Sequence, residues 1–159
     1  MGADLCAIEE AEEFLRDVPE KQPFMATSCC PAWSVMAKKL FPEYADCVSM
    51  ALTPMTLTAR LIKKQHEKAK VVFIGPCAAK KLEAMRRSVR SEVDFVLTFE
   101  ELQGMFDAKN IDFTTLEADP EDGLNEGTSM GRGFAVGGGV AAAVVEAIKH
   151  IDPTREVQI

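Results

Sequence analysis

Residues 71–80 read Val-Val-Phe-Ile-Gly-Pro-Cys-Ala-Ala-Lys, and this stretch decides the fold class. Its first four residues form an unbroken apolar run, which is typical of a strand buried on both faces in a parallel sheet. The Gly-Pro pair then turns the chain into a helix that we expect over residues 78–87. A second buried strand is expected at residues 93–97. Alternating strands and helices predict an α/β protein with a mainly parallel sheet flanked by helices.

Outward from this stretch, apolar residues recur at helical spacing, and capping residues mark where helices begin. Thr98 followed by Glu101 predicts a capping box. Residues 119–132 lack periodicity and are rich in Asp, Glu and Gly, so we expect a long loop there. The other expected helices are residues 4–18, a helix that starts at Pro31 and ends at Pro42, residues 53–66, and a last helix that a Gly-Gly-Gly run opens at 137 and that ends near 150.

Size and charge narrow the function classes. The chain has 159 residues, about one domain, and a formal net charge of -7. Nucleic acids and anionic membranes attract basic surfaces, so neither is an expected partner. No apolar run approaches the roughly 20 residues of a membrane span, and no secretory signal is recognised at the start. Five unevenly spaced cysteines make a poor disulfide framework, and we expect a reducing cytoplasm: Cys6, Cys29, Cys30, Cys47 and Cys77.

Cysteines occupy two places where a strand is expected to give way to a helix. Cys29 and Cys30 follow an extended approach at residues 24–27, and Cys77 follows the apolar run quoted above. Ligands bind at such strand ends in α/β sheets, and helix N-termini favour thiolates. Both sites could therefore place a thiolate on a shared centre. Spacing alone leaves another interpretation open, because a lone cysteine is more often an inert buried residue.

Two longer motifs carry a resemblance to a known family. Residues 27–33, Thr-Ser-Cys-Cys-Pro-Ala-Trp, resemble the first signature of iron-only ([FeFe]) hydrogenases. Residues 75–83, which contain Pro-Cys-Ala-Ala-Lys-Lys-Leu-Glu, resemble the second signature, in the family's order and at its usual separation. Residues 134–140 resemble a further segment of the same family. The resemblance covers nearly the whole chain and implies the iron-only hydrogenase fold.

The resemblance implies a metal cofactor. In this family the H-cluster joins a [4Fe–4S] cluster, held by four cysteines, to a two-iron unit that bears CO and cyanide. Cys30 and Cys77 correspond to two of the four cysteines. The other two belong to a third signature that this sequence does not contain. We therefore expect residues 1–159 to form a partial catalytic domain, inactive by itself, that is completed by the missing C-terminal part of the same domain.

The resemblance also implies a route for protons. Cys29 corresponds to the proton donor of the two-iron unit, and a thiol suits this role because its pKa is tunable. Glu10, Glu13 and Ser49 match the rest of the route, and the i, i+3 spacing of the glutamates puts them on one helix face. The match needs a one-residue gap, so Glu9 and Glu12 stay possible. An acidic helix face that is merely solvated is the alternative.

Four residues are implied to contact the cofactor. Lys80 would donate to a cyanide of the two-iron unit, and Glu83, three residues on, could pair with it. Trp33, Phe134 and Pro76 would line the cofactor pocket, although the two aromatic residues could equally be ordinary core residues.

The implied function is a hydrogenase, which interconverts H₂ with protons and electrons and uses ferredoxin or a similar electron carrier as its partner. The first alternative is a non-catalytic relative that assembles iron–sulfur clusters or acts as a sensor. Because assembly relatives usually lack the cysteine doublet, Cys29 favours the enzyme. A thiol-redox or zinc module is a weaker alternative, because it does not explain Lys80.

Overall fold

The computed structural model describes residues 1–90, 92–117 and 127–159, which fall into two compact units. The first unit contains the described residues 1–58 and 127–159, and the second contains 59–90 and 92–117. Among these residues, no helix combines the length and apolar character that crossing a membrane requires.

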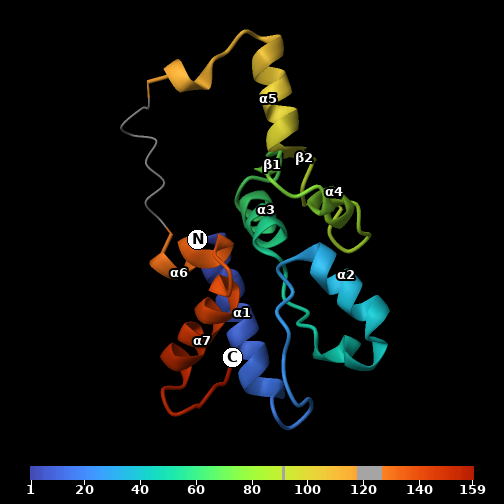
Figure 1. Ribbon diagram of the computed structural model, residues 1–159, viewed down its shortest axis with the longest axis vertical. Coiled ribbons are helices and arrows are strands. Elements are labelled where there is room, and N and C mark those ends of the chain that lie inside the picture. Colours follow the sequence, from blue (N-terminus) through green and yellow to red (C-terminus); the bar gives the residue numbers. More distant parts are fainter. Residues whose placement is uncertain (91, 118–126) are drawn as a thin grey trace. The chain divides into compact units, whose positions relative to one another are not determined.

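The core of the first unit lies between its first and last helices. Helix α1 (Gly2–Asp17) packs against α7 (Gly139–Ile151), and Figure 1 shows the two side by side. Small side chains let the two backbones approach closely, and burying their apolar faces stabilises the pair. The fully or nearly fully buried residues of this core are Ala7, Ala11, Ala143, Val144, Ala147 and Ile148.

The remaining elements of this unit are short. They are α2 (Pro31–Leu40), the 3₁₀ helix η1 (Pro42–Cys47), the first turn of α3 (Pro54–Gln65), α6 (Ser129–Arg132) and the 3₁₀ helix η4 (Gly133–Ala135).

The start of α7 requires glycine. Gly138 has a φ of 76°, in the left-handed region. A Cβ on Gly139 would lie 1.9 Å from the carbonyl oxygen of Gly133. The Gly-Gly-Gly run therefore begins the last helix as expected, and it also lets two backbone segments touch.

The second unit is built on two parallel strands. Strand β1 (Val72–Gly75) pairs with β2 (Phe95–Thr98), and the register runs from Val72 opposite Phe95 to Gly75 opposite Thr98. Helix α4 (Ala79–Ala84) follows β1, and α5 (Phe99–Ala108) follows β2. A 3₁₀ turn, η2 (Phe113–Thr115), follows α5. The α/β order with a parallel strand pair is confirmed.

Capping explains where α5 begins. The Thr98 hydroxyl accepts from the Glu101 N–H at 3.3 Å, and the Glu101 carboxylate accepts from the Thr98 N–H at 2.9 Å. The predicted capping box is therefore confirmed. Such reciprocal bonds satisfy two N–H groups that have no partner within the helix.

Burial of the strands was predicted wrongly. Val72, Ile74 and Phe95 are 45%, 44% and 63% exposed. A sheet of two strands is narrow. Each of its faces therefore offers little area against which another element can pack. The apolar run therefore indicated a strand correctly, but it did not indicate how far the faces of that strand are buried.

Other boundaries also differ from the predictions. Helix α4 ends at Ala84, not near residue 87. The expected loop at 119–132 is helical at its end, in α6, while residues 118–126 lie outside the described parts. In α2 the apolar side chains of Trp33 and Leu40 are 40% and 65% exposed, because the face of this helix that is buried carries Pro31, Ser34 and Ala37 instead.

Candidate functional site

Two extended segments support the site in the first unit. The Ala26 N–H donates to the Cys47 carbonyl at 2.8 Å, and the Ser49 N–H donates to the Ala26 carbonyl at 2.9 Å. These bonds form an isolated parallel bridge between Ala26 and Val48. The bridge fixes the residues that follow on each segment, which are Ser28 and Ser49. Both serines are buried and both contact carboxylates of α1.

Glu10 is a fully buried carboxyl group. Its Oε1 accepts from the Ser28 N–H at 2.7 Å and lies 3.4 Å from the Ser28 hydroxyl. Its Oε2 is buried and has no hydrogen-bond partner among the described residues. Burial raises the pKa of Glu10 above its ordinary value of 4.5, and repulsion from Glu13 adds to this rise, while hydrogen bonds from Ser28 oppose it. Glu10 is therefore a buried carboxyl group that keeps its proton to a higher pH than an exposed glutamate does.

Glu13 lies one helical turn further along α1. Its Oε2 accepts from the Ser49 hydroxyl at 2.5 Å, and its Oε1 accepts from the Met50 N–H at 3.0 Å. Ser49 is 3% exposed and also lies close enough to Glu10 to lower the pKa of that group. Glu10, Glu13 and Ser49 are thus brought together, as their predicted roles require. The roles themselves stay predictions.

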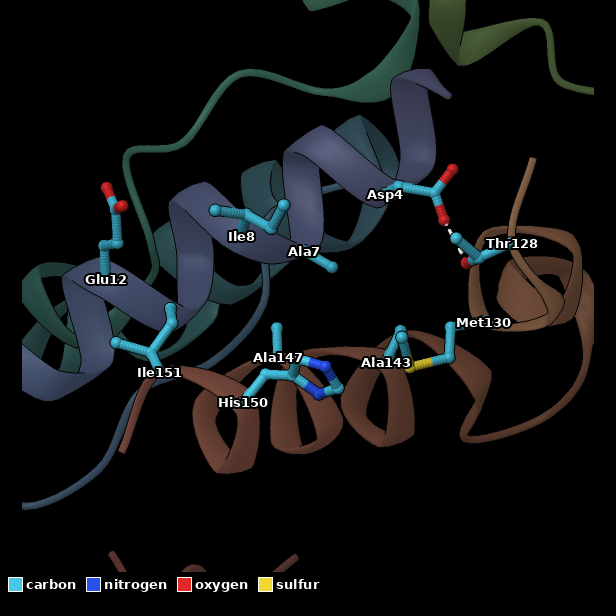
Figure 2. A pocket seen from close by; sticks show the side chains of 10 residues that line it. All are labelled: Asp4, Ala7, Ile8, Glu12, Thr128, Met130, Ala143, Ala147, His150 and Ile151. Atoms are coloured by element: carbon cyan, nitrogen blue, oxygen red, sulfur yellow. Dashed lines mark hydrogen bonds between the residues drawn. The ribbon is translucent and has the colours of Figure 1, made fainter. Parts of the chain in front are cut away.

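The other glutamate pair lies differently. Glu12 is exposed and lines a cavity of about 360 Å³ between α1 and α7, which Figure 2 shows. This cavity is walled mainly by apolar side chains such as Ile8, and at one end Asp4 accepts a hydrogen bond from Thr128. The structure therefore favours Glu10 and Glu13 over Glu9 and Glu12 as the pair beside Ser49.

The raised pKa of Glu10 predicts a pH-dependent stability. A carboxyl group whose pKa is higher in the folded chain than in the unfolded chain lowers the free energy of unfolding as the pH rises. We expect Glu10→Gln to melt like the wild type below about pH 4.5, the ordinary glutamate value, to gain in melting temperature over the wild type as the pH rises from there to the raised pKa, and to keep that gain at higher pH. Each kcal/mol corresponds to about 2–4 °C in a chain of this size. Thermal unfolding followed by circular dichroism from pH 4 to pH 8 measures this difference.

The exposed Glu12 provides the matched control on the same helix. Glu12→Gln should follow the wild type across this pH range. Equal melting temperatures of Glu10→Gln and the wild type at pH 8 would show that burial of the charged Glu10 carboxylate does not destabilise the fold.

The cysteine doublet lies at the start of α2. Cys30 is the N-cap of this helix, is exposed, and its Sγ accepts from the Trp33 N–H at 3.4 Å. Cys29 is half-buried and follows Ser28, whose N–H binds Glu10. The Trp33 indole N–H donates to the Thr27 carbonyl at 3.1 Å, and this bond joins the last residue of the motif to its first.

The second unit carries the other cysteine motif. Cys77 is half-buried and follows the carboxyl end of β1, while Pro76 is exposed. Lys80 and Glu83 form an ion pair at 2.8 Å with side chains only 11% and 4% exposed. The expected pairing of Lys80 with Glu83 is confirmed.

Phe134 belongs to the first unit and packs against the α1–α7 core. This position fits an ordinary core aromatic residue, which was one of the two interpretations. The pocket-lining roles of Phe134, Trp33 and Pro76 stay predictions.

The donor chemistry fits an iron–sulfur cluster in part. Cys30 and Cys77 offer soft thiolate ligands, each at a turn into a helix. They belong to different units, so the convergence of their sulfurs stays a prediction. Within residues 1–90, 92–117 and 127–159, no three His, Cys, Asp or Glu side chains gather as a metal site. Two cysteines account for half of a cubane's usual four ligands.

Sequence reasoning missed Ser28 and the Met50 backbone, although both bind the carboxylates. Ser28 stood inside the cysteine motif, and a serine directly before the cysteine doublet was the available signal. The N–H of Met50 could not be found from sequence, because any residue type supplies it.

Comparisons with known proteins point to the same family as the two sequence motifs. The family model described as iron only hydrogenase large subunit, C-terminal domain, matches residues 1–158. Iron hydrogenase 1 of Clostridium pasteurianum is 29% identical over 171 residues, which cover 99% of this chain and 30% of that protein. The cytosolic Fe-S cluster assembly factor NAR1 of Kluyveromyces lactis is 33% identical over 108 residues, which cover 67% of this chain and 23% of that protein.

A solved structure confirms the fold class. A variant of the [FeFe]-hydrogenase HydA1 from Chlamydomonas reinhardtii matches with a TM-score of 0.72 and 26% identity, over 99% of this chain and 44% of that chain. The helix-rich architecture with a small parallel sheet is therefore shared. The chain spans less than half the length of each of these three proteins.

Proposed function

This chain belongs to the iron-only hydrogenase large-subunit family, C-terminal domain, and we propose that it forms part of the catalytic scaffold of a hydrogenase. In this proposal it supplies two cysteine ligands, Cys30 and Cys77, and a proton route that ends at Cys29. The single observation that carries the proposal is the pair of hydrogen bonds that hold the α1 carboxylates, from the Ser28 N–H to Glu10 and from the Ser49 hydroxyl to Glu13, with Ser28 directly before the cysteine doublet in the sequence.

The family's cofactor would be held by this chain through thiolates and one ammonium group. Cys30 and Cys77 would ligate the [4Fe–4S] part, with two further cysteines supplied from outside residues 1–159. The H-cluster, when bound, would supply the redox chemistry that interconverts H₂ with protons and electrons, and ferredoxin or a similar carrier would be the electron partner. Lys80 would donate to an anionic ligand of the two-iron unit, and Glu83 orients its ammonium group.

Protons would enter at Glu13. Met50, whose N–H binds the Glu13 carboxylate, is 77% exposed, so this end of the route is near solvent. The Ser49 hydroxyl donates to Glu13 in the structure, so inward transfer requires it to turn, give its own proton to Glu10 and accept the proton of Glu13 in return, as a hydroxyl is both donor and acceptor.

Glu10 would hold the proton at the inner end. Its raised pKa favours the protonated carboxyl, and its Oε2 has no hydrogen-bond partner among the described residues, which leaves this oxygen for exchange. The bond from the Ser28 N–H ties the Glu10 carboxyl group to the residue that directly precedes Cys29 in the sequence. Cys29 then holds the proton as a thiol until it is delivered.

Replacing the carboxylates tests this route. In the protein that carries this chain, loaded with its cofactor, we expect Glu10→Gln and Glu13→Gln to cut hydrogen evolution by about 10²-fold or more, because an amide cannot shuttle protons. Bound iron should not change. Hydrogen evolution with a chemically reduced carrier, measured by gas chromatography, gives the rates.

Glu12→Gln is the control, because Glu12 lies on the same helix but is exposed. Rates of Glu10→Gln and Glu13→Gln within twofold of the wild type would remove both glutamates from the route.

A second candidate function is iron–sulfur cluster assembly, which the similarity to NAR1 proteins favours. It would use the same cysteines to hold a cluster without turnover. The two functions differ in one result, since a cofactor-loaded assembly factor evolves no hydrogen. Cytoplasmic location, the electron carrier and the partial nature of the domain stay predictions.

A further inference from the structure

Ser28 lies between two hydrogen-bond acceptors. Its hydroxyl oxygen is 3.0 Å from the Ala51 carbonyl oxygen and 3.4 Å from Oε1 of Glu10. A serine hydroxyl carries a single proton and can donate to only one acceptor at a time. Its backbone N–H, by contrast, donates to the same Oε1 at 2.7 Å and cannot turn away. Ser28 therefore offers Glu10 one fixed donor and one that can rotate.

We propose that Ser28 is the positioning residue of Glu10, with its N–H fixing the carboxyl group and its hydroxyl turning between Glu10 and Ala51 as the carboxyl loses and gains a proton. This inference rests on the proposed role of Glu10 as a proton carrier.

The physical reason is the cost of a buried charge. A buried carboxyl that cycles between its neutral and charged forms needs a different number of donors in each form. When Glu10 is charged, the Ser28 hydroxyl donates to Oε1 alongside the N–H. When Glu10 is neutral, the hydroxyl turns to the Ala51 carbonyl, so that neither form leaves the serine proton without an acceptor. Oε2 is not used by either donor.

The backbone of Ala51 forms hydrogen bonds with both Ser28 and Ser49. Its N–H donates to the Ser49 hydroxyl oxygen at 3.1 Å, while its carbonyl accepts from Ser28. Because the Ser49 oxygen accepts there, the Ser49 proton is directed at Glu13. One backbone unit thus orients both hydroxyl groups that contact the carboxylates of α1.

The surroundings make the effect of Ser28 measurable. Glu13 is the charged group that acts on Glu10, one turn away on the same helix. The face of α7 that packs on α1 is apolar and consists of Ala143, Val144, Ala147 and Ile148. A change at Ser28 should therefore appear directly in the titration of Glu10.

The test is a titration of Glu10 in the 159-residue chain, with glutamate side chains labelled with ¹³C at the carboxyl carbon. Glu10→Gln assigns the signal. We expect Ser28→Ala to lower the acid dissociation constant of Glu10 by about threefold, because a weak hydrogen bond to the charged form is lost. Ser34→Ala is the matched control, since Ser34 is equally buried but its hydroxyl donates to the Pro31 carbonyl. It should leave the titration unchanged.

Ser28→Thr and Ser28→Val form a second pair, which has nearly the same shape and differs in the hydroxyl. Thr should titrate like the wild type and Val like Ala. Equal titration of Thr and Val, or an equal shift with Ser34→Ala, overturns the inference.

Activity separates this inference from the proposed function. If Glu10→Gln leaves hydrogen evolution unchanged in the cofactor-loaded protein, the proton route itself fails. If Glu10→Gln stops evolution but Ser28→Ala leaves the titration of Glu10 where it was, only the role of Ser28 fails.

Discussion

Alanine at position 30 or at position 77 should abolish retention of a [4Fe–4S] cluster in the protein that carries this chain. The two thiols sit at separate turns into α2 and α4, and the proposal assigns both to one cubane. Such a cluster is normally held by four cysteines, so each replacement leaves an iron without its thiolate. We expect Cys30→Ala and Cys77→Ala each to reduce bound iron and acid-labile sulfide on the order of tenfold or more after anaerobic reconstitution.

Cys47 supplies the control for this experiment. It is 6% exposed, lies in η1, and has no assigned role, so Cys47→Ala should keep the cluster. Retention of full iron content by both Cys30→Ala and Cys77→Ala would contradict the assignment. Tight zinc uptake that depends on these two residues, without iron binding, would instead support a zinc module.

Cys29→Ala should cost about 10²–10⁴-fold in hydrogen evolution while the cluster content stays at the wild-type level. Cys29 follows Ser28, whose N–H holds Glu10, and it precedes Cys30, which caps α2. Loss of its thiol breaks the route between Glu10 and the cofactor but removes no cluster ligand. Gas chromatography of evolved H₂, normalised to iron content, measures the effect.

Cys6→Ala is the matched control, because Cys6 is a buried cysteine on α1 outside both motifs. It should evolve hydrogen at the wild-type rate per iron. Unchanged turnover in Cys29→Ala would remove the thiol from the route, and absence of turnover in the loaded wild type would favour the assembly function.

Local chemistry made most of the elements predictable from sequence. Thr98 and Glu101 specify a capping box, and Pro31 begins α2 where a missing N–H costs nothing. The Gly-Gly-Gly run begins α7 because the backbone there needs a positive φ and close contact. The i, i+3 spacing of Glu10 and Glu13 puts both on one helix face, whereas the place of Ser49 beside Glu13 was implied by the family resemblance.

Burial and backbone contacts were less predictable. Val72 and Ile74 are as apolar as residues of a buried strand, but whether a face is covered depends on neighbouring elements, which no local pattern encodes. The same limit applies to Trp33 on α2. Ser28 was overlooked because its role comes from a bridge between two segments, 26–28 and 47–51, that only the fold aligns.

An iron-edge anomalous difference map tests the central claim most directly. Crystals would be grown anaerobically from the cluster-loaded protein that carries this chain. We predict one compact iron peak bonded to the Sγ atoms of both Cys30 and Cys77. An iron peak that touches neither sulfur, or two cysteines bound to separate peaks, would contradict the account.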